Sequence, residues 1–166
     1  TLEARLDQIL NNTPVVIYSC EASGDFAATF VSQNMRTECG YEPRQFLEDP
    51  TFWLSRVHPQ DQDLVKTGLK HVMAGRRHGH SYRFRCADGE YRWYYDEIVP
   101  LPGPGGGIAG LAGFMLDITE RKRAEAKMAA ALATLDAIDD AAFIFDPDSL
   151  RFTYVNEGAL QQLGYS

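Results

Sequence analysis

Histidine and cysteine are the residue types in this sequence whose chemistry suits a metal site. His78 and His80 are separated by one residue and precede Cys86. A zinc site needs three or four ligands at suitable spacing, and two histidines in a polar segment form only a weak pattern. We therefore predict a solvated loop here and no metal site. Cys20 and Cys39 add no metal-type spacing, and three cysteines cannot all pair, so we expect small hydrophobic side chains in a reducing compartment.

The sequence contains none of the motifs that build a common catalytic site. It has no Gly-x-Ser-x-Gly motif, no glycine loop placed after a strand to hold phosphates, and no carboxylate pair at metal-binding spacing. The glycine-rich run over residues 102–107 predicts a connection between two strands instead. We therefore expect no enzymatic activity from this chain.

Charge and hydropathy exclude two classes of partner. The formal net charge is −7, and the basic runs at residues 76–77 and 121–123 are short. Nucleic-acid binding needs a clustered basic face, so we expect no nucleic-acid partner. No apolar run approaches the ~20 residues of a membrane span, and no signal peptide is recognisable at the start. We therefore expect a cytoplasmic protein without membrane contact in this segment.

Two periodicities predict the elements that must position any site. Helical spacing predicts helices over residues 2–10 and 61–74, with shorter helices between residues 34 and 61. Alternation and β-branched or aromatic runs predict strands over residues 15–19, 28–32, 81–86, 91–99 and 108–116. The dipeptide Asp88-Gly89 predicts a type I′ hairpin turn between the third and fourth strands.

The last predicted strand is rich in small side chains, namely Ala109, Gly110, Ala112 and Gly113. Small residues in a strand allow another segment or a ligand to approach the sheet closely. We therefore expect either a cavity over this strand or large side chains such as Trp93 and Phe114 that fill the space.

After residue 117 the chain becomes helical and carries a heptad pattern. Spacings of three and four residues connect Arg121, Ala124, Met128, Ala131, Leu135 and Ile138. Such a seam is typical of a paired helix, although its alanines make it weak. We predict a signalling helix over residues 120–140 that forms a homodimer; the alternative is a single helix packed on its own domain.

The chain also repeats part of itself. Residues 30–33 match residues 154–157, residues 40–41 match 164–165, and residues 6–9 match 135–138. The predicted organisation is therefore a linking helix, a complete unit, a signalling helix and the start of a second unit, over residues 1–12, 13–119, 120–140 and 141–166. The second hairpin, over residues 143–155, lacks its neighbouring strands, so we expect a docked surface to order it.

Four segments resemble one family. Residues 30–34 with Gly40-Tyr41 resemble its "VS-x-N" segment, and Trp53 with residues 57–61 resembles "W…VHPDD". Residues 83–93 are similar to its "R-x-DG-x-x-RW" hairpin, and residues 117–122 match its "DITERK" junction. Together, and in this order, they resemble the PAS family with its C-terminal PAC motif.

The resemblance implies an α+β fold: a five-stranded antiparallel sheet with short helices over one face, followed by a linking helix. It implies a ligand cleft, for which the candidates are Trp53, Tyr82, Trp93 and Phe114. No cofactor is the first expectation, and a non-covalent flavin or a small metabolite stays open. Haem is not expected, since His71 does not fall where haem-binding relatives place their ligand. Covalent flavin chemistry is not expected either, because Cys39 is followed by Gly40-Tyr41 rather than by the light-sensing motif.

The resemblance further implies a sensory or relay role in a multi-PAS bacterial protein. A sensor histidine kinase is the first expectation for the parent, and a diguanylate cyclase or phosphodiesterase is the alternative. Two roles stay open: a sensor that binds a small molecule, and a ligand-free dimerisation and relay module. The signal would leave through the junction Asp117, Ile118, Thr119 and Glu120, where Asp117 and Glu120 could cap the next helix as in a capping box.

Overall fold

The computed structural model describes residue 5, residues 8–10 and residues 12–164. The chain separates into two compact units, one up to Thr119 and one from Glu120 onward. Most of the linking helix expected over residues 1–12 lies outside the described residues, and so does the very end of the chain.

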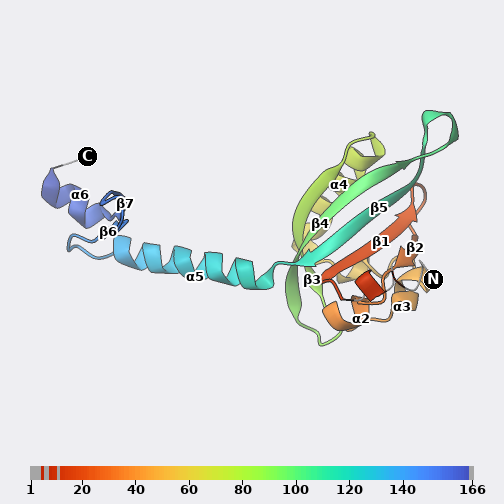
Figure 1. Cartoon of the computed structure of the whole chain (residues 1–166), viewed down its shortest axis with the longest axis horizontal. Coiled ribbons are helices and arrows are strands. Elements are labelled where there is room, and N and C mark those ends of the chain that lie inside the picture. Colours follow the sequence, from red (N-terminus) through yellow and green to blue (C-terminus); the bar gives the residue numbers. More distant parts are fainter. Residues whose placement is uncertain (1–4, 6–7, 11, 165–166) are drawn as a thin grey trace. The chain divides into compact units, whose positions relative to one another are not determined.

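Within the described part of the first unit, five strands form one antiparallel sheet in the order β2-β1-β5-β4-β3 (Figure 1). The bounds are β1 Val15–Glu21, β2 Ala28–Val31, β3 His78–Arg85, β4 Tyr91–Pro102 and β5 Ile108–Asp117. The strand alternation in the sequence thus gives the expected sheet. The first and last strands of this sheet, β1 and β5, pair with each other in its interior, with Val16 opposite Met115.

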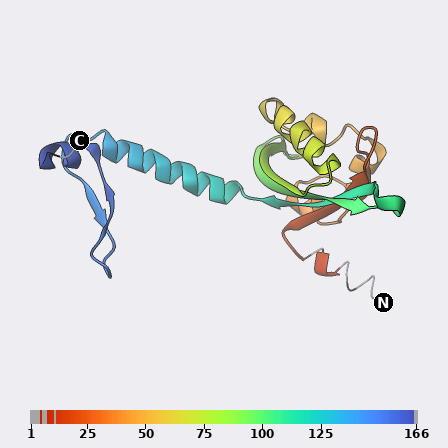
Figure 2. The ribbon, with the colours of Figure 1, turned by 90° about the horizontal axis from the view of Figure 1, so that it is seen from above.

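Helices between β2 and β3 cover one face of this sheet (Figures 1 and 2). They are α2 Met35–Glu38, α3 Pro43–Glu48, η1 Leu54–Arg56, η2 Pro59–Asp61 and α4 Gln62–Met73. Pro43 starts α3, where Glu42 and Gln45 form a reciprocal capping box. Gly75, in the left-handed conformation at φ 83°, follows α4 as expected for a helix stop.

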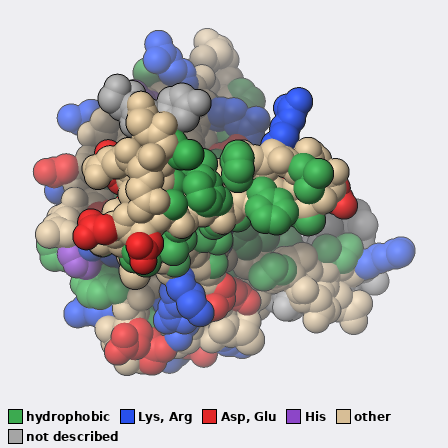
Figure 3. Space-filling model, turned by 90° about the vertical axis from the view of Figure 1, so that its left-hand side faces the viewer, with side chains coloured by type: hydrophobic (Ala, Val, Ile, Leu, Met, Phe, Trp, Pro, Cys, Tyr) green, Lys and Arg blue, Asp and Glu red, His purple; other side chains and the backbone are tan. Residues whose placement is uncertain are grey.

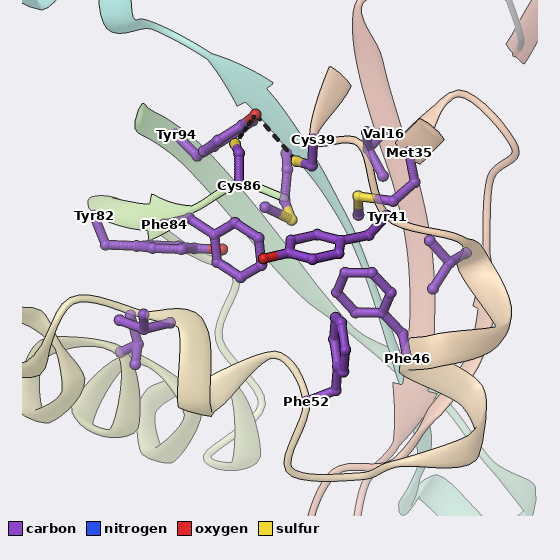
Figure 4. Packing of buried hydrophobic residues seen from close by; sticks show 14 residues of the cluster. Val16, Met35, Cys39, Tyr41, Phe46, Phe52, Tyr82, Phe84, Cys86 and Tyr94 are labelled. Carbon is purple, nitrogen blue, oxygen red and sulfur yellow. Dashed lines mark hydrogen bonds between the residues drawn. The ribbon is translucent and has the colours of Figure 1, made fainter. Parts of the chain in front are cut away.

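The core lies between the helices and the sheet. From the sheet, Tyr82 and Phe84 of β3 and Tyr94 of β4 are completely buried. From the helical side, the rings of Phe46 and Phe52 pack edge-on with centroids 4.7 Å apart (Figure 4). Edge-to-face packing of buried rings stabilises the core beyond the apolar area that they remove from water. This aromatic cluster holds the helical layer on the sheet.

The turn between β3 and β4 differs from the predicted type I′ hairpin. A type I′ turn needs positive φ at both central residues, but only Gly89 has it, at φ 87°. The Gly89 amide donates to the Cys86 carbonyl at 3.0 Å, and the Cys86 amide donates to the Glu90 carbonyl at 2.9 Å. The connection is therefore a longer loop with a single left-handed glycine. The glycine-rich segment after β4 forms the short helix η3, Pro104–Gly106, and connects β4 to β5 as predicted.

The second unit begins with most of helix α5, Thr119–Asp136, followed by β6 Phe143–Phe145, β7 Phe152–Val155 and α6 Glu157–Leu163. β6 and β7 form the expected hairpin, and its apolar side chains are exposed: Phe143, Ile144, Phe145 and Phe152. On the face of the molecule turned toward the viewer in Figure 3, hydrophobic side chains gather at the surface. That a docked surface covers this hairpin stays a prediction.

Candidate functional site

A cavity of about 780 Å³ lies between the helix-covered face of the sheet and the helices α3 and α4. This volume falls within the roughly 300–1,000 Å³ typical of small-molecule sites. All five strands except β3 contribute to the lining, together with α2, α3 and α4. Most of the lining is apolar and includes Phe26, Ala28, Val31, Met35, Phe46, Trp53, Leu54, Leu69, Met73, Ile98 and Met115.

The polar side chains of the lining are few and are charged or already bonded. Lys66 and Lys70 belong to α4, and Asp25 and Asp49 belong to loops. The hydroxyl of Thr51 donates to Asp49 at 2.7 Å. The described lining contains no Asn, Gln, His or Arg side chain. Flavin presents a polar ring edge that needs hydrogen-bonding partners, so the lining fits an apolar molecule better than a flavin.

Behind the lining lies a buried chain of hydrogen bonds. The Tyr18 hydroxyl donates to one oxygen of Asp96 at 2.7 Å, and the Tyr82 hydroxyl donates to the other at 2.8 Å. The indole N–H of Trp53 donates to the Tyr82 hydroxyl at 3.0 Å. Burial raises the pKa of Asp96 to about 7, against the lowering effect of the two tyrosine hydrogen bonds. The Asp96 carboxyl is therefore poised to change protonation near neutral pH.

Of the four candidate cleft residues, only Trp53 is in the described lining, and Tyr82 lies behind it as the acceptor of the Trp53 indole N–H. The described lining does not include Trp93 or Phe114, so their prediction was wrong. On β4 the buried phase of the alternation is Tyr94, Asp96 and Ile98. Trp93 and Phe114 alternate with buried residues of β4 and β5 and therefore belong to the opposite face of the sheet.

The small residues of β5 have a more specific role than predicted. A Cβ atom on Gly113 would lie 2.5 Å from the Tyr18 hydroxyl. Gly113 therefore lets the Tyr18 side chain cross β5 and reach Asp96 on β4. The alternation puts Gly110 and Ala112 in the phase opposite to buried Leu111, so they do not enlarge the cavity.

The predicted solvated loop at the histidine pair was wrong. Both histidines belong to β3, and His80 is only 8 % exposed. The rings of His71, His78 and His80 form a row with centroids 5.1 and 5.0 Å apart. A Cβ atom on Gly68 would lie 2.6 Å from His80 Nδ1, so this glycine lets α4 pack against the row. Neither ring nitrogen of His80 has a hydrogen-bond partner among the described residues.

Burial is the largest cause that lowers the pKa of His80, and neighbouring His78 adds to it; the pKa falls to about 4. Across the sheet, His80 is the register partner of Asp96. Two buried titratable groups with opposite pKa shifts thus lie opposite each other, and sequence reasoning missed both. Within the described residues no group of three potential ligands could hold a metal ion. His71 belongs to α4 but is not among the described cavity-lining residues.

The junction residues are fixed to β4. The Ile118 amide donates to the Trp93 carbonyl at 2.8 Å, and the Trp93 amide donates to the Thr119 hydroxyl at 3.0 Å. Asp117 accepts from the Thr119 amide at 2.8 Å and so caps the start of α5. Glu120 does not complete a capping box in the hydrogen bonds of the described residues, because it pairs with Arg123 at 2.7 Å. Trp93 therefore belongs to the junction through its backbone rather than to the cleft.

We expect Thr119→Val to lower the free energy of unfolding by about 1–2 kcal/mol, because the partly buried Trp93 amide loses its acceptor while the side-chain shape is kept. Urea denaturation of the purified chain measures this change. The control is Thr134→Val, since the exposed Thr134 hydroxyl donates to the Ala130 carbonyl one turn back in the same helix, and it should shift stability by less than ~0.5 kcal/mol. Equal effects of the two variants would contradict the role of Thr119.

The predicted dimer seam is on α5 up to Leu135. Ala124, Met128 and Ala131 are exposed, with Met128 62 % accessible. Ile138 lies beyond the end of α5 at Asp136, so its inclusion in the helical seam was wrong. The Asn156 amide group donates to the carbonyls of Leu135 and Ile138 at 2.9 and 3.2 Å, and thereby fixes the chain after the helix ends. The dimer itself stays a prediction.

The fold and the cavity together define an α+β domain built around a space of ligand size. The family described as the PAS fold matches residues 28–115, and a second family description, PAS domain, matches residues 129–166. The chain belongs to the PAS family. The predicted family and the five-stranded α+β fold are thus confirmed, and the second match falls on the internal repeat.

Two of the curated relatives are described as sensors. The chain is 29% identical over 157 residues to the methyl sulfide methyltransferase-associated sensor of Methanosarcina acetivorans, covering 93% of the chain and 16% of that protein. It is 27% identical over 129 residues to the two-component sensor PprA of Pseudomonas aeruginosa, covering 76% of the chain and 14% of that protein. The chain therefore spans less than a fifth of the length of these relatives.

Solved structures support the same fold. The N-terminal domain of a diguanylate cyclase with PAS/PAC sensor from Marinobacter aquaeolei has a TM-score of 0.58 at 25% identity, covering 65% of this chain and 98% of that one. A sensory box histidine kinase/response regulator from Burkholderia thailandensis has a TM-score of 0.63 at 22% identity, covering 81% and 99%. Among the described residues of this chain, none of the helices is long and apolar enough to cross a membrane.

Proposed function

We propose that the first unit is the sensory module of a signal-transduction protein and binds an apolar small molecule in its cavity. The observation that carries this proposal is the 780 Å³ cavity, which has an apolar lining on the helix-covered face. Had Trp93 and Phe114 filled this space, a ligand-free relay would be favoured; they belong to the other face. The proposal therefore favours the sensor role over the relay role.

The ligand class follows from the lining. Tyr18 and Trp53 already donate to Asp96 and Tyr82, so they offer few free donors to a ligand. Lys66 and Lys70, one turn apart on α4, are the cationic side chains of the described lining. The site thus suits a mainly apolar molecule that carries at most one acidic group at its edge.

The output is proposed to leave through the junction and α5. A ligand that displaces β4 or β5 acts on the junction directly, because Ile118 and Thr119 are bonded to Trp93. The exposed seam of α5 suits a homodimer that passes the movement to a downstream domain. That domain is proposed to be a histidine kinase in the same cytoplasmic polypeptide, in keeping with the relatives; the diguanylate cyclase neighbour supports the alternative.

The four methionines of the sequence provide the test. Met35, Met73 and Met115 line the cavity, whereas Met128 is on α5. We expect titration with the apolar anion 1-anilinonaphthalene-8-sulfonate to shift the methyl NMR signals of the three cavity methionines saturably and to leave Met128 unchanged. Native mass spectrometry of freshly purified protein then shows whether a natural ligand is retained.

A pair of variants on β2 sharpens the test. Ala28→Trp fills the cavity and should weaken binding of the probe at least ~10-fold. Thr29→Trp is the control, because Thr29 is exposed and points to the other side of the strand. Shifts confined to Met128, or equal binding by both variants, would refute a ligand site in the cavity and would favour the relay role.

A further inference from the structure

Two buried thiols lie together at the edge of the core away from the ligand cavity. Cys39 ends α2 and Cys86 follows β3, and both are about 1 % exposed. The Cys39 thiol donates to the Tyr94 hydroxyl at 3.1 Å, and the Cys86 sulfur lies 3.7 Å from the same oxygen (Figure 4). Within the described chain both cysteines are free thiols.

The backbone holds the two segments against each other. The Ala87 amide donates to the Cys39 carbonyl at 2.9 Å. A Cβ atom on Gly40 would lie 2.9 Å from the Cβ atom of Ala87, so the residues that follow each cysteine are also in contact. Residues 39 and 86 are thus kept adjacent by contacts that do not depend on the thiols. Such adjacency is what a disulfide requires.

We infer that Cys39 and Cys86 form a reversible, peroxide-sensitive disulfide in this domain. The two thiols are chemically unequal, as such a reaction needs. The adjacent Cys39 thiol lowers the pKa of Cys86, and Tyr94 and Arg92 add to this effect against the effect of burial. The pKa of Cys39 is raised by its interaction with Cys86 and by burial. Cys86 is therefore the thiol of the pair that ionises more readily, and Cys39 is the partner that keeps its proton.

The reaction balances with a hydroperoxide as oxidant. The Cys86 thiolate attacks the peroxide, the O–O bond breaks, and Cys86 becomes a sulfenic acid while an alcohol or water leaves with one proton. The Cys39 sulfur then attacks the sulfenic sulfur, loses its proton and releases water as the disulfide forms. Two thiols are oxidised by two electrons and one peroxide is reduced; a dithiol reductant reverses the change.

Access to the thiols needs only local opening. Ala87, Asp88 and Gly89, which follow Cys86 in the loop, are exposed, as is Gly40 after Cys39. A short solvent-exposed loop opens far more readily than the core. The third thiol is different, since burial and Asp96 raise the pKa of Cys20 to about 11, and Cys20 lines the ligand cavity instead. Cys20 is expected to stay reduced.

The pair is close to the output junction. The Tyr94 hydroxyl contacts both sulfurs, and Tyr94 is the register partner of Asp117, the residue that caps α5. Oxidation removes the thiol proton that Cys39 donates to Tyr94. A redox change at this pair thus acts on Tyr94, which is paired with Asp117 at the start of the signalling helix. This redox site is separate from the ligand site proposed above.

The test is peptide mapping of the whole chain after treatment with hydrogen peroxide, without reduction. We expect a mass loss of about 2 Da per chain and a Cys39–Cys86 linked peptide at least ~10-fold more abundant than any product containing Cys20. The melting temperature should rise by about 5–10 °C and return after dithiothreitol treatment, because the disulfide closes a long loop.

Two variants separate this pair from general oxidation. Cys20→Ser should form the same disulfide at the same rate, whereas Cys39→Ala should accumulate a Cys86 sulfenic acid that dimedone traps. Linked peptides containing Cys20 in equal yield, or unmodified Cys39 and Cys86 when exposed methionines are already oxidised, would overturn the inference. Both of these results come from the wild-type chain, so they decide the question even if Cys39→Ala does not fold.

Discussion

His80→Leu is expected to make the protein more stable than the wild type by about 2 kcal/mol at pH 5 and nearly equal to it at pH 7. The imidazole is buried without a partner for either ring nitrogen among the described residues, so leucine of similar size removes no hydrogen bond. The pKa of His80 is lowered to about 4 in the folded protein. With His80 neutral, the wild type therefore keeps its full stability above the ordinary histidine pKa. It loses stability as the pH falls below that pKa, because the unfolded chain then binds a proton that the buried imidazole does not.

Asp96 contributes with the opposite sign. Burial raises the pKa of its carboxyl to about 7. The folded protein keeps this proton between pH 4 and 7 while the unfolded chain releases it, so stability is lost as the pH rises through this range. In the wild type the two slopes oppose each other, and we expect little net pH dependence from this pair between pH 4 and 6.5. His80→Leu should expose the Asp96 slope as a fall of about 3 kcal/mol between pH 4.5 and 7.

Urea denaturation at several pH values measures both effects. The matched control is His71→Leu, because His71 belongs to the same row of rings but is exposed. This variant should keep the pH profile of the wild type. A His80→Leu profile parallel to that of the wild type would show that the pKa of His80 is not lowered in the folded protein.

Strand alternation made the sheet predictable. Where it failed to predict which side chains face the core, the cause can be identified. In β3, Tyr82 and Phe84 alternate with Arg83 and Arg85, so only one phase can be buried. In β4 both phases contain aromatic residues, and the buried phase also contains Asp96. Because Asp96 is polar, the phase of β4 that contains Trp93 appears the more apolar one in the sequence. For this reason Trp93 was predicted, wrongly, to face the cleft.

The buried polar network was beyond sequence reasoning because its partners are distant in the chain. Asp96 is bonded to Tyr18, 78 residues away, and Gly113 makes room for this contact from a third strand. The end of α5 depends in the same way on Asn156, 21 residues beyond Leu135. Local spacing predicted the heptad through Leu135, but it could not show that a later side chain binds the carbonyls where the helix stops.

The segments that resemble the PAS family were recognisable in the sequence, but the contacts that their residues make are visible only in the fold. Asp61, from the segment that begins with His58-Pro59, accepts from the Arg83 backbone amide and Nε at 2.9 Å each, and from Arg83 Nη2 at 2.7 Å. The Arg83 guanidinium lies 5.4 Å from the centre of the Trp93 ring. The segment with Asp61 and the hairpin with Arg83 are thus parts of one contact. Through Arg83 this contact reaches Trp93, whose backbone is bonded to the junction.

We expect Asp61→Ala to lower the free energy of unfolding by about 2–3 kcal/mol at pH 7, since the carboxylate accepts three hydrogen bonds from Arg83 at a largely buried position. The hydrogen bonds to Arg83 lower the pKa of Asp61. Its contribution is therefore present above the ordinary aspartate pKa and is lost as the pH falls through the lowered value. The difference between the wild type and Asp61→Ala should shrink in acid.

The same variant tests whether the helical layer supports the junction. Without Asp61 the Arg83 side chain is no longer held over Trp93, so hydrogen exchange of the Ile118 amide, which donates to the Trp93 carbonyl, should accelerate more than that of the Met115 amide within β5. The control is Glu125→Ala, which removes an exposed pair with Arg121 on α5 and should leave both the denaturation midpoint and Ile118 exchange unchanged. Unchanged Ile118 exchange in Asp61→Ala, with stability lost, would mean that this ion pair supports the fold without reaching the junction, and that a ligand signal must enter α5 through β5 alone.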